Sequence, residues 1–354
     1  MNFASDNAAG VAPEILAALT RANQGFARAY GNDDWTERLE RRFCELFERE
    51  VAVFLVATGT AANSLALAHV TPVWGGVLCH SESHIVTDEC GAPEFFGGGL
   101  KLLGLPGEGA KLSPDTVAAA IARYSGHVPH QVNAATLSLT QATEAGTIYR
   151  VEELRRLADV AHKRGLAVHV DGARFANALS RMNCSPAEAT WKAGVDVLSL
   201  GATKGGAMAA EAIVVFDKAR AAFMGERRKR GGHLVSKHRF IAAQFEAWLA
   251  EDLWLKLARH ANAMADRLAA RLTAAGIKPV WPVEANEVFV VLPRAVQERL
   301  TELGATFYQR NSDSLPASVV VAPDAGLVRL VTSFQTTEAE IDEFAAQAAA
   351  ARTK

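Results

Sequence analysis

The stretch VDVLSLGATKGGA (195–207) decides the interpretation of this 354-residue chain, because an apolar, strand-like run leads directly into Lys204. Small residues on both sides of Lys204 leave room for a flat, bulky group. A second apolar run, LAVHV (166–170), ends in Asp171. Ligands of α/β sheets bind at the carboxyl ends of the strands, so we expect Lys204 and Asp171 at the same end of one sheet.

An amine and a carboxylate in this arrangement are what pyridoxal phosphate requires. The amine forms a Schiff base with the cofactor aldehyde, and the carboxylate keeps the pyridine nitrogen protonated so that the ring withdraws electrons. Each residue alone has a simpler explanation, since a lysine after a strand is usually solvated and Asp-Gly commonly forms a turn. Together, and with the motifs below, Lys204 and Asp171 favour a site for this cofactor.

Composition places the chain among ordinary globular proteins, 49% hydrophobic and 21% charged. A net charge of -2 gives no electrostatic case for binding nucleic acid or acidic membranes. Polar residues interrupt the apolar run 51–70, so we do not expect it to span a membrane. The four cysteines lack CxxC spacing, which argues against a zinc site and favours a reduced, cytoplasmic location. We therefore expect a small-molecule substrate and no metal, nucleic-acid or membrane partner.

Strand-like and helix-like segments alternate through the first 240 residues, which predicts a mostly parallel sheet covered by helices. Helices are expected at 60–70 and 151–165, the second with Gly165 as its stop. Strands are expected at 51–56, 77–80, 101–105, 135–140, 166–170, 195–200 and 212–217.

The character of the sequence changes after about residue 240. Two long helices rich in alanine and leucine (240–276) are followed by short strands (288–293 and 328–334) and a terminal helix. We therefore predict a large α/β domain over residues 1–240 that binds the cofactor. A smaller C-terminal α+β domain over residues 241–354 should share an interface with it.

The motif ATGTAAN (57–63) is the candidate phosphate-binding segment, because a helix N-terminus offers free backbone N–H groups and a favourable dipole. Gly59 permits close approach of the backbone, Thr60 adds a hydroxyl, and Ala61 opens the helix without bulk. The same residues also suit an ordinary helix cap. The sequence lacks the GxGxxG and GxxxxGK[ST] fingerprints of nicotinamide and nucleoside triphosphate sites.

His84 lies in a polar, glycine-rich segment, CHSESHIVTDECGAPEFFGGG (79–99). An imidazole here could stack on a pyridine ring and act on a substrate hydroxyl. His80 is the alternative, and spacing alone does not separate the two histidines. The basic run at 227–230 also has two interpretations, a solvated helix face and an anion-binding site.

Together these motifs resemble the low-specificity L-threonine aldolases, which are fold-type I (aspartate aminotransferase-like) pyridoxal phosphate enzymes. The resemblance runs nearly from end to end, and the order and spacing of the motifs make it specific. The matching segments are FASDN (3–7), AYGND (29–33), ATGTAAN (57–63), SHIVTDECGAPEFF (83–96), LTQATEAGTIY (139–149), HVDGARFANAL (169–179), WKAGVDVLSLGATKGG (191–206), RKRGG (228–232), PVEANEVF (282–289) and VRLVTSF (328–334).

The resemblance implies a role for each matching residue. Lys204 would form the Schiff base, Asp171 would bind the pyridine nitrogen, and His84 would stack on the cofactor ring. The phosphate cup would be formed by Gly59, Thr60 and Ala61. The substrate α-carboxylate would be held by a clamp of Ser5, Arg174 and Arg329, and Arg174 would also lie beside the cofactor. An arginine of the basic run, taken as Arg228, would reach a cofactor phosphate across a subunit boundary.

One departure concerns the general base. Some relatives carry a second histidine where this chain reads QATEAG (141–146). The proton of the substrate β-hydroxyl would then be removed by His84, by an ordered water or by Glu144, in that order of preference.

The resemblance implies an aldehyde-lyase, a homotetramer built as a dimer of dimers. It would cleave L-threonine, L-allo-threonine and other L-β-hydroxy-α-amino acids to glycine and an aldehyde. Alternatives on the same fold are an L-phenylserine-type aldolase and a β-eliminating lyase. A non-catalytic scaffold is disfavoured, because it has no need for Lys204, Asp171 and the carboxylate-binding arginines together.

Overall fold

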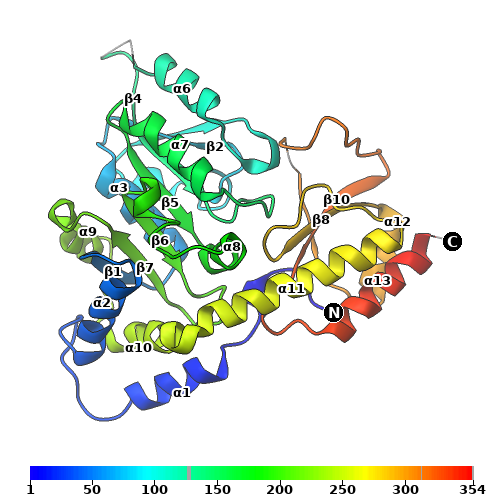
Figure 1. Cartoon of the computed structure of the whole chain (residues 1–354), viewed down its shortest axis with the longest axis horizontal. Coiled ribbons are helices and arrows are strands. Elements are labelled where there is room, and N and C mark those ends of the chain that lie inside the picture. The colour runs from blue at the N-terminus through cyan, green and yellow to red at the C-terminus, as the bar shows by residue number, and fades with distance from the viewer. Residues whose placement is uncertain (126–128, 312, 353–354) are drawn as a thin grey trace.

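The computed structural model describes residues 1–125, 129–311 and 313–352. A seven-stranded sheet in the order β1-β7-β6-β5-β4-β2-β3 forms the centre of its larger part. A three-stranded sheet in the order β8-β10-β9 forms the centre of the smaller part. Figure 1 shows the large sheet enclosed by helices on the left and the small sheet on the right, with α11 running between them.

The large sheet is parallel except for β7, which pairs antiparallel with both β1 and β6. All seven predicted strands are present, so the prediction of a mostly parallel sheet is confirmed. The central strands are buried along their whole length, which explains their nearly continuous apolar sequence. The strands are β1 (Ala52–Val56), β2 (Gly75–His80), β3 (Lys101–Leu105), β4 (Asn133–Thr140), β5 (Ala167–Gly172), β6 (Val197–Gly201) and β7 (Glu211–Val215).

Both helices predicted in the first half are present, and the helical stretch predicted over 240–276 consists of two helices. Gly165, the predicted stop of the second helix, has a φ of 74°, a left-handed value that glycine adopts without strain. The helices are α1 (Pro13–Ala22), α2 (Asp34–Leu46), α3 (Gly59–Val70), α4 (His84–Thr87), α5 (Ala92–Phe96), α6 (Pro114–Arg123), α7 (Val151–His162), α8 (Phe175–Met182), α9 (Met224–Arg230), α10 (Arg239–Leu249), α11 (Leu253–Ala274), α12 (Arg294–Glu302) and α13 (Glu338–Arg352). Short 3-10 helices are η1 (Asp6–Ala8), η2 (Glu108–Ala110), η3 (Trp191–Ala193), η4 (Lys218–Ala221) and η5 (Ala250–Asp252).

The small sheet joins β8 (Glu287–Pro293), β10 (Ala325–Val331) and β9 (Tyr308–Gln309) in antiparallel pairs. Its core also contains Phe3 from the N-terminal segment. The first turns of α11 pack in the core of the large sheet, and its later turns pack in the core of the small sheet. A single helix therefore links the two cores, and the domain boundary predicted after residue 240 stays a prediction.

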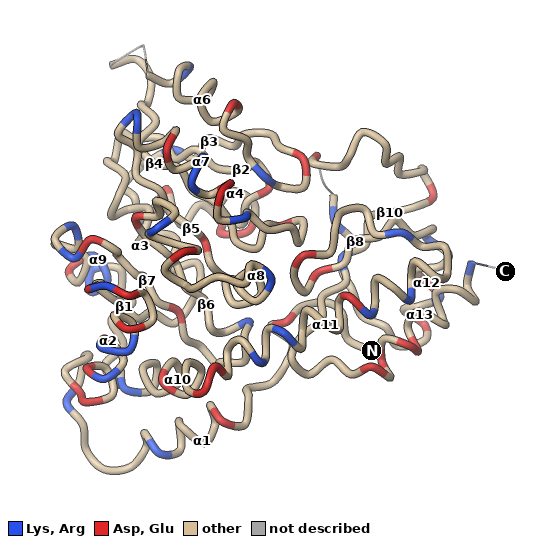
Figure 2. Tube along the Cα trace, in the orientation of Figure 1, with Lys and Arg blue, Asp and Glu red and all other residues tan. Residues whose placement is uncertain are grey.

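Charged residues are interspersed by sign along most elements, with a local concentration of basic residues on α9 (Figure 2). The basic run at 227–230 is thus helical, as its interpretation as a solvated helix face requires. Within the described part of the chain, none of the helices has the length and apolar character that crossing a membrane demands.

Candidate active site

A cavity of about 420 Å³ opens at the carboxyl-terminal edge of the large sheet. Residues that follow β1, β4, β5 and β6 form its walls, together with Glu211, which begins the antiparallel strand β7 at the same edge. Lys204 and Asp171 both line this cavity. The structure therefore brings these two residues together at one end of the sheet, as the sequence leads us to expect.

The Asp171 carboxylate is buried and held in a fixed orientation. Its Oδ1 accepts a hydrogen bond from the backbone N–H of Ala173 at 3.0 Å, and its Oδ2 accepts one from Asn63 Nδ2 at 2.9 Å. Lys204 follows β6 in a turn that ends at Gly206, whose φ is 108°. A short turn after a buried strand thus carries the amine into the cavity.

His84 lines the cavity, whereas His80 is buried outside it, with Nε2 2.9 Å from the carbonyl oxygen of Gly107. His84 Nδ1 lies 2.9 Å from Oε1 of Glu89, whose side chain is fully buried. This hydrogen bond raises the pKa of His84, although burial opposes the shift. With Nδ1–H donated to a carboxylate, Nε2 is the nitrogen left to exchange a proton.

Asn63 links the histidine to the aspartate. Its Nδ2 donates to Glu89 Oε1 at 2.8 Å and to Asp171 Oδ2 at 2.9 Å. The amide therefore stands between two buried carboxylates that would otherwise repel each other, and it fixes the positions of both. His84, Glu89, Asn63 and Asp171 form one continuous network along the cavity wall.

The N-terminus of α3 also lines the cavity. Gly59 and Thr60 line it, and so does Thr58, whose Oγ1 caps the helix by accepting the backbone N–H of Ala61 at 3.1 Å. Ala61 itself is buried, and its N–H is already used by this cap. The free N–H groups of the first turn make this end suited to an anion such as a phosphate.

Glu211 is buried beside this anion-binding end. A Cβ built on Gly59 would lie 4.0 Å from Glu211 Oε2, and one built on Gly201 would lie only 2.9 Å from it. The same Cβ at Gly201 would lie 3.0 Å from the Cα of Ala173, so the backbone there, together with the carboxyl group, leaves no room for a side chain. Burial raises the pKa of Glu211 to about 7, so the group can be neutral beside a bound anion.

A second cavity of about 500 Å³, the outer cavity, adjoins the first and shares Asn7, His84, Glu144, Arg174 and Lys204 with it. Ser5 and Arg329 line only this outer cavity. The three residues predicted to hold a substrate carboxylate therefore meet in one place, although they come from the N-terminal segment, the end of β5 and the small sheet.

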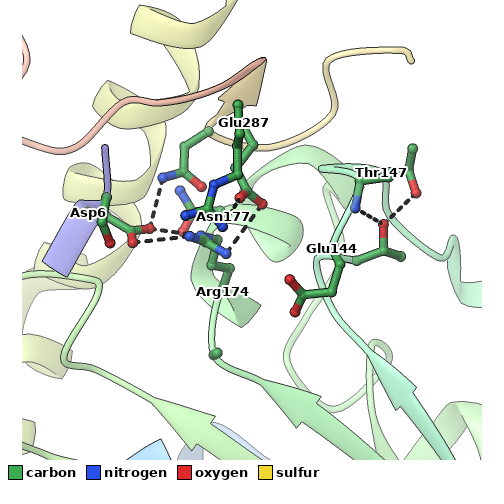
Figure 3. A network of polar contacts seen from close by, with 12 residues as sticks. Asp6, Glu144, Thr147, Arg174, Asn177 and Glu287 are labelled. Atoms are coloured by element: carbon green, nitrogen blue, oxygen red, sulfur yellow. Dashed lines mark hydrogen bonds and ion pairs between the residues drawn. The ribbon is translucent and has the colours of Figure 1, made fainter. Parts of the chain in front are cut away.

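Arg174 is buried between two carboxylates, Asp6 and Glu287 (Figure 3). Its Nε and Nη2 donate to Asp6 at 2.8 and 3.1 Å, and its Nη1 lies 3.3 Å from Glu287 Oε2. Arg329 lies on the other side of Glu287, with Nη1 at 3.8 Å from Oε1. The guanidinium groups are held in place by anions from the chain itself.

Glu144 lines both cavities and pairs with Arg310 Nη1 at 3.3 Å. Burial would raise the pKa of this carboxyl, but Arg310, Lys204 and His84 outweigh it and hold the pKa below its usual range. Glu144 is thus an ion-paired anion and a weak base. This favours His84 over Glu144 as the group that accepts a proton.

Arg228 lies away from these cavities. Its Nη1 donates to the carbonyl oxygen of Leu55 at 3.1 Å, and its guanidinium stacks over the ring of Phe54. With Tyr30 and His238 it lines a separate cavity of about 50 Å³. Any contact of Arg228 with a cofactor phosphate would have to be made in the cavity of another subunit.

Sequence reasoning did not identify several side chains that shape the site. The helix cap Thr58 could have been found from its place before Gly59-Thr60. The partners of the predicted residues carry no local pattern, because most of them reach across a long stretch of chain, and Glu89, five residues from His84, lies in a segment crowded with polar residues. These side chains are Asp6, Asn63, Glu89, Glu211 and Glu287.

The residues present fit pyridoxal 5'-phosphate. A buried aspartate oriented into the cavity suits the pyridine nitrogen, and the N-terminus of α3 suits the phosphate. Ala142 and Ala173 on the wall leave space for a flat ring, and Lys204 supplies the amine.

Comparison with known proteins agrees with this reading of the site. Residues 2–295 match the family described as beta-eliminating lyase. A low specificity L-threonine aldolase of Pseudomonas aeruginosa is 47% identical over 86% of this chain and 88% of its own length. Another from a Pseudomonas species is 41% identical over 97% of this chain and 96% of its own.

Solved structures show the same fold. The threonine aldolase of Leishmania major superposes with a TM-score of 0.90 at 29% identity, covering 98% of each chain. A serine palmitoyltransferase of Sphingomonas wittichii, at 15% identity, shares the fold alone, with a TM-score of 0.69 over 100% of this chain and 87% of its own. The fold is that of the fold-type I enzymes, and the cofactor is pyridoxal 5'-phosphate. The chain therefore belongs to the beta-eliminating lyase family and, within it, to the low-specificity L-threonine aldolases.

Proposed function

We propose that this enzyme cleaves L-threonine and L-allo-threonine, with other L-β-hydroxy-α-amino acids, to glycine and an aldehyde. The observation that carries the proposal is the pair of joined cavities. The inner one combines Lys204, Asp171 and a helix N-terminus, and the outer one adds two arginines suited to a carboxylate. An amino-acid substrate fits across the junction of the two.

The cofactor, when bound, supplies an electron-withdrawing ring conjugated to the substrate nitrogen, which weakens the bonds to the substrate Cα. Lys204 would hold its aldehyde carbon and Asp171 its pyridine nitrogen. Gly59 and Thr60, with the cap residue Thr58, would hold its phosphate. His84 lies on the same wall and would lie against the ring.

The outer cavity sets the orientation of the substrate. Arg174 and Arg329 would bind the α-carboxylate, assisted by the Ser5 hydroxyl, and would thereby select the bond at Cα that is broken. His84 would accept the proton of the β-hydroxyl at Nε2, because Nδ1 is bonded to Glu89. An ordered water and Glu144 are the remaining choices for this role. The ion pair of Glu144 with Arg310 supports ranking Glu144 last.

We also propose a cytoplasmic homotetramer built as a dimer of dimers. The four free cysteines support a reducing location. The position of Arg228, outside the cavity of its own chain, supports a role in a neighbouring subunit. Exposed aromatic side chains nearby, Tyr30 and Phe223, are candidates for that interface. Sedimentation analysis of the holoenzyme tests the assembly, and a monomer that cleaves threonine at full rate would contradict it.

Product analysis tests the reaction. The purified holoenzyme should release glycine and acetaldehyde in equal amounts from L-threonine. Preferred release of benzaldehyde from phenylserine would indicate an aldolase for aromatic substrates. Release of 2-oxobutanoate and ammonia from L-threonine, or of pyruvate and ammonia from L-serine, without glycine, would show a β-eliminating lyase and overturn the proposal.

A further inference from the structure

The two carboxylates that hold Arg174 are bonded very differently. Asp6 accepts hydrogen bonds from Arg174 Nε and Nη2 at 2.8 and 3.1 Å and a third from Asn286 Nδ2 at 3.1 Å. Glu287 is an ion-pair neighbour of Arg174 and Arg329, yet neither of its oxygens has a hydrogen-bond partner within the described part of the chain. Figure 3 shows Arg174 between the two acids. Glu287 is therefore the more weakly held partner.

Glu287 lies behind the arginines as seen from the substrate cavity. Its side chain is fully buried at the start of β8, whereas Arg174 and Arg329 line the outer cavity. Gly146 packs directly against it, since a Cβ there would lie 3.1 Å from Glu287 Cβ. This packing restrains the base of the side chain, and the carboxyl group lies beside both guanidinium groups without lining either cavity.

The local charges are balanced before substrate arrives. Two guanidinium groups, Arg174 and Arg329, face two carboxylates, Asp6 and Glu287. The neighbouring anion Glu144 has its own cation, Arg310. A substrate α-carboxylate adds a third anion to the same two cations. One anion in this buried cluster must then lose its charge or its pairing, because an excess buried charge is costly.

Glu287 is the group that can change. Burial raises its pKa; Arg174 and Arg329 lower it in part, and the charges of Glu144 and Asp6 raise it further. Asp6 differs, because Arg174, Lys204 and its hydrogen bonds hold its pKa below the usual range despite burial. A further anion nearby would therefore place a proton on Glu287 before Asp6.

We propose that Glu287 is an internal competitor of the substrate α-carboxylate for Arg174 and Arg329, and that it takes up one proton from solvent when a carboxylate binds there. The inference rests on the proposed role of these arginines. It makes Glu287 a residue that sets substrate affinity and its pH dependence without touching the substrate. Carboxylate ligands should bind more weakly as the pH rises, by up to about tenfold per pH unit between the pKa of Glu287 in the free enzyme and in the complex.

The test uses glycine, which carries the α-carboxylate but has no β-carbon to cleave. Holoenzyme is titrated with glycine at pH 7 and pH 9, and binding is followed by the visible absorption of the cofactor. Calorimetry in two buffers of different ionisation enthalpy gives the protons taken up. Glu287→Gln should bind glycine more tightly than the parent, at least about threefold at pH 9, and should take up fewer protons, by up to one.

Two further variants sharpen the result. Glu287→Met removes the charge with a side chain of similar volume, so it should reproduce Glu287→Gln, and it serves if the glutamine variant does not fold. Glu302→Gln is the matched control, because Glu302 is an exposed residue of α12 paired with Arg299, and it should leave glycine affinity and proton uptake at parent values. Weaker glycine binding in both Glu287 variants, or unchanged affinity and proton uptake, would overturn the proposal.

Failure of this inference can be told apart from failure of the proposed function. If the parent releases glycine from L-threonine and Arg329→Lys weakens glycine binding, the carboxylate clamp stands. Parent-like glycine binding in Glu287→Gln would then refute only the competition by Glu287. If Arg329→Lys and Arg174→Lys bind glycine as tightly as the parent does, the assignment of these arginines to the α-carboxylate is wrong. The inference about Glu287 then fails with it.

Discussion

Replacing Asp6 with asparagine should destabilise the protein substantially, because it removes the charge that best neutralises Arg174. The side chains of Arg174 and Asp6 are 6% and 2% exposed, and they meet through two hydrogen bonds. Removing one partner of a buried ion pair costs about 3–5 kcal/mol. We expect about 3 kcal/mol, at the lower end, since asparagine keeps an acceptor oxygen and Glu287 remains 3.3 Å from the guanidinium.

Asp266→Asn is the matched control. Asp266 pairs with Arg181 at 2.7 Å, but its side chain is 48% exposed, and such pairs contribute only about 0–1 kcal/mol. Urea denaturation of the parent and both variants, at one cofactor concentration, gives the free energies of unfolding. If Asp6→Asn loses no more stability than Asp266→Asn, the Asp6–Arg174 pair does not have the importance we assign to it.

The same pair predicts a pH dependence. Burial alone would raise the pKa of Asp6, but Arg174, Lys204 and hydrogen bonds hold it below the usual range. Its folded pKa is therefore lower than the unfolded value of about 3.9. The stabilisation is fully present above the unfolded pKa and is lost as the pH falls through the folded pKa. The stability difference between parent and Asp6→Asn should thus narrow below about pH 4, and a constant difference there would contradict the assignment.

Three further predictions concern the site. His84→Phe should keep the affinity for the cofactor but lower turnover by ~100-fold or more, since general-base help is lost. If His84→Phe were as active as the parent and His80→Phe were inactive, His80 would be the general base instead. Arg329→Lys keeps the charge but loses the planar fork, so it should weaken substrate binding with an unchanged cofactor spectrum; loss of the cofactor instead would place Arg329 at the phosphate. Only L-substrates should react. The ratio of kcat/KM between L-threonine and L-allo-threonine should be roughly 100-fold at most, because a misplaced methyl group changes the transition-state free energy by no more than that ratio corresponds to. Measuring kcat/KM for all four threonine stereoisomers tests both statements, and turnover of a D-isomer or exclusion of one L-isomer would contradict them.

The large sheet could be predicted because buried parallel strands leave a strong local pattern of short apolar runs separated by helical segments. The direction of β7 could not, since its apolar run looks the same in either orientation. The helices α1 and α2 were also missed. Each has a capping feature at its start, Pro13 in α1 and Asp33 before α2, but both lie in a region where no strand alternates with them.

Candidate residues at strand ends could be found from sequence because each follows an apolar run by a fixed short distance. Lys204 and Asp171 are of this kind. The groups that orient these candidate residues follow no such local rule. Asp6 reaches Arg174 across 168 residues, and Asn63 reaches Asp171 across 108. Contacts between residues so far apart in the sequence are set by tertiary packing, and no spacing of motifs in a single sequence reveals them.

The central claim is that Lys204 holds the cofactor and takes part in every turnover. Lys204→Ala is the direct measurement, with Lys218→Ala, an exposed lysine paired with Glu50, as the control. The control should match the parent. Lys204→Ala should remain folded but lose the visible absorption of the lysine-bound cofactor and all but a trace of acetaldehyde release from L-threonine. Parent-like turnover in Lys204→Ala would contradict the account.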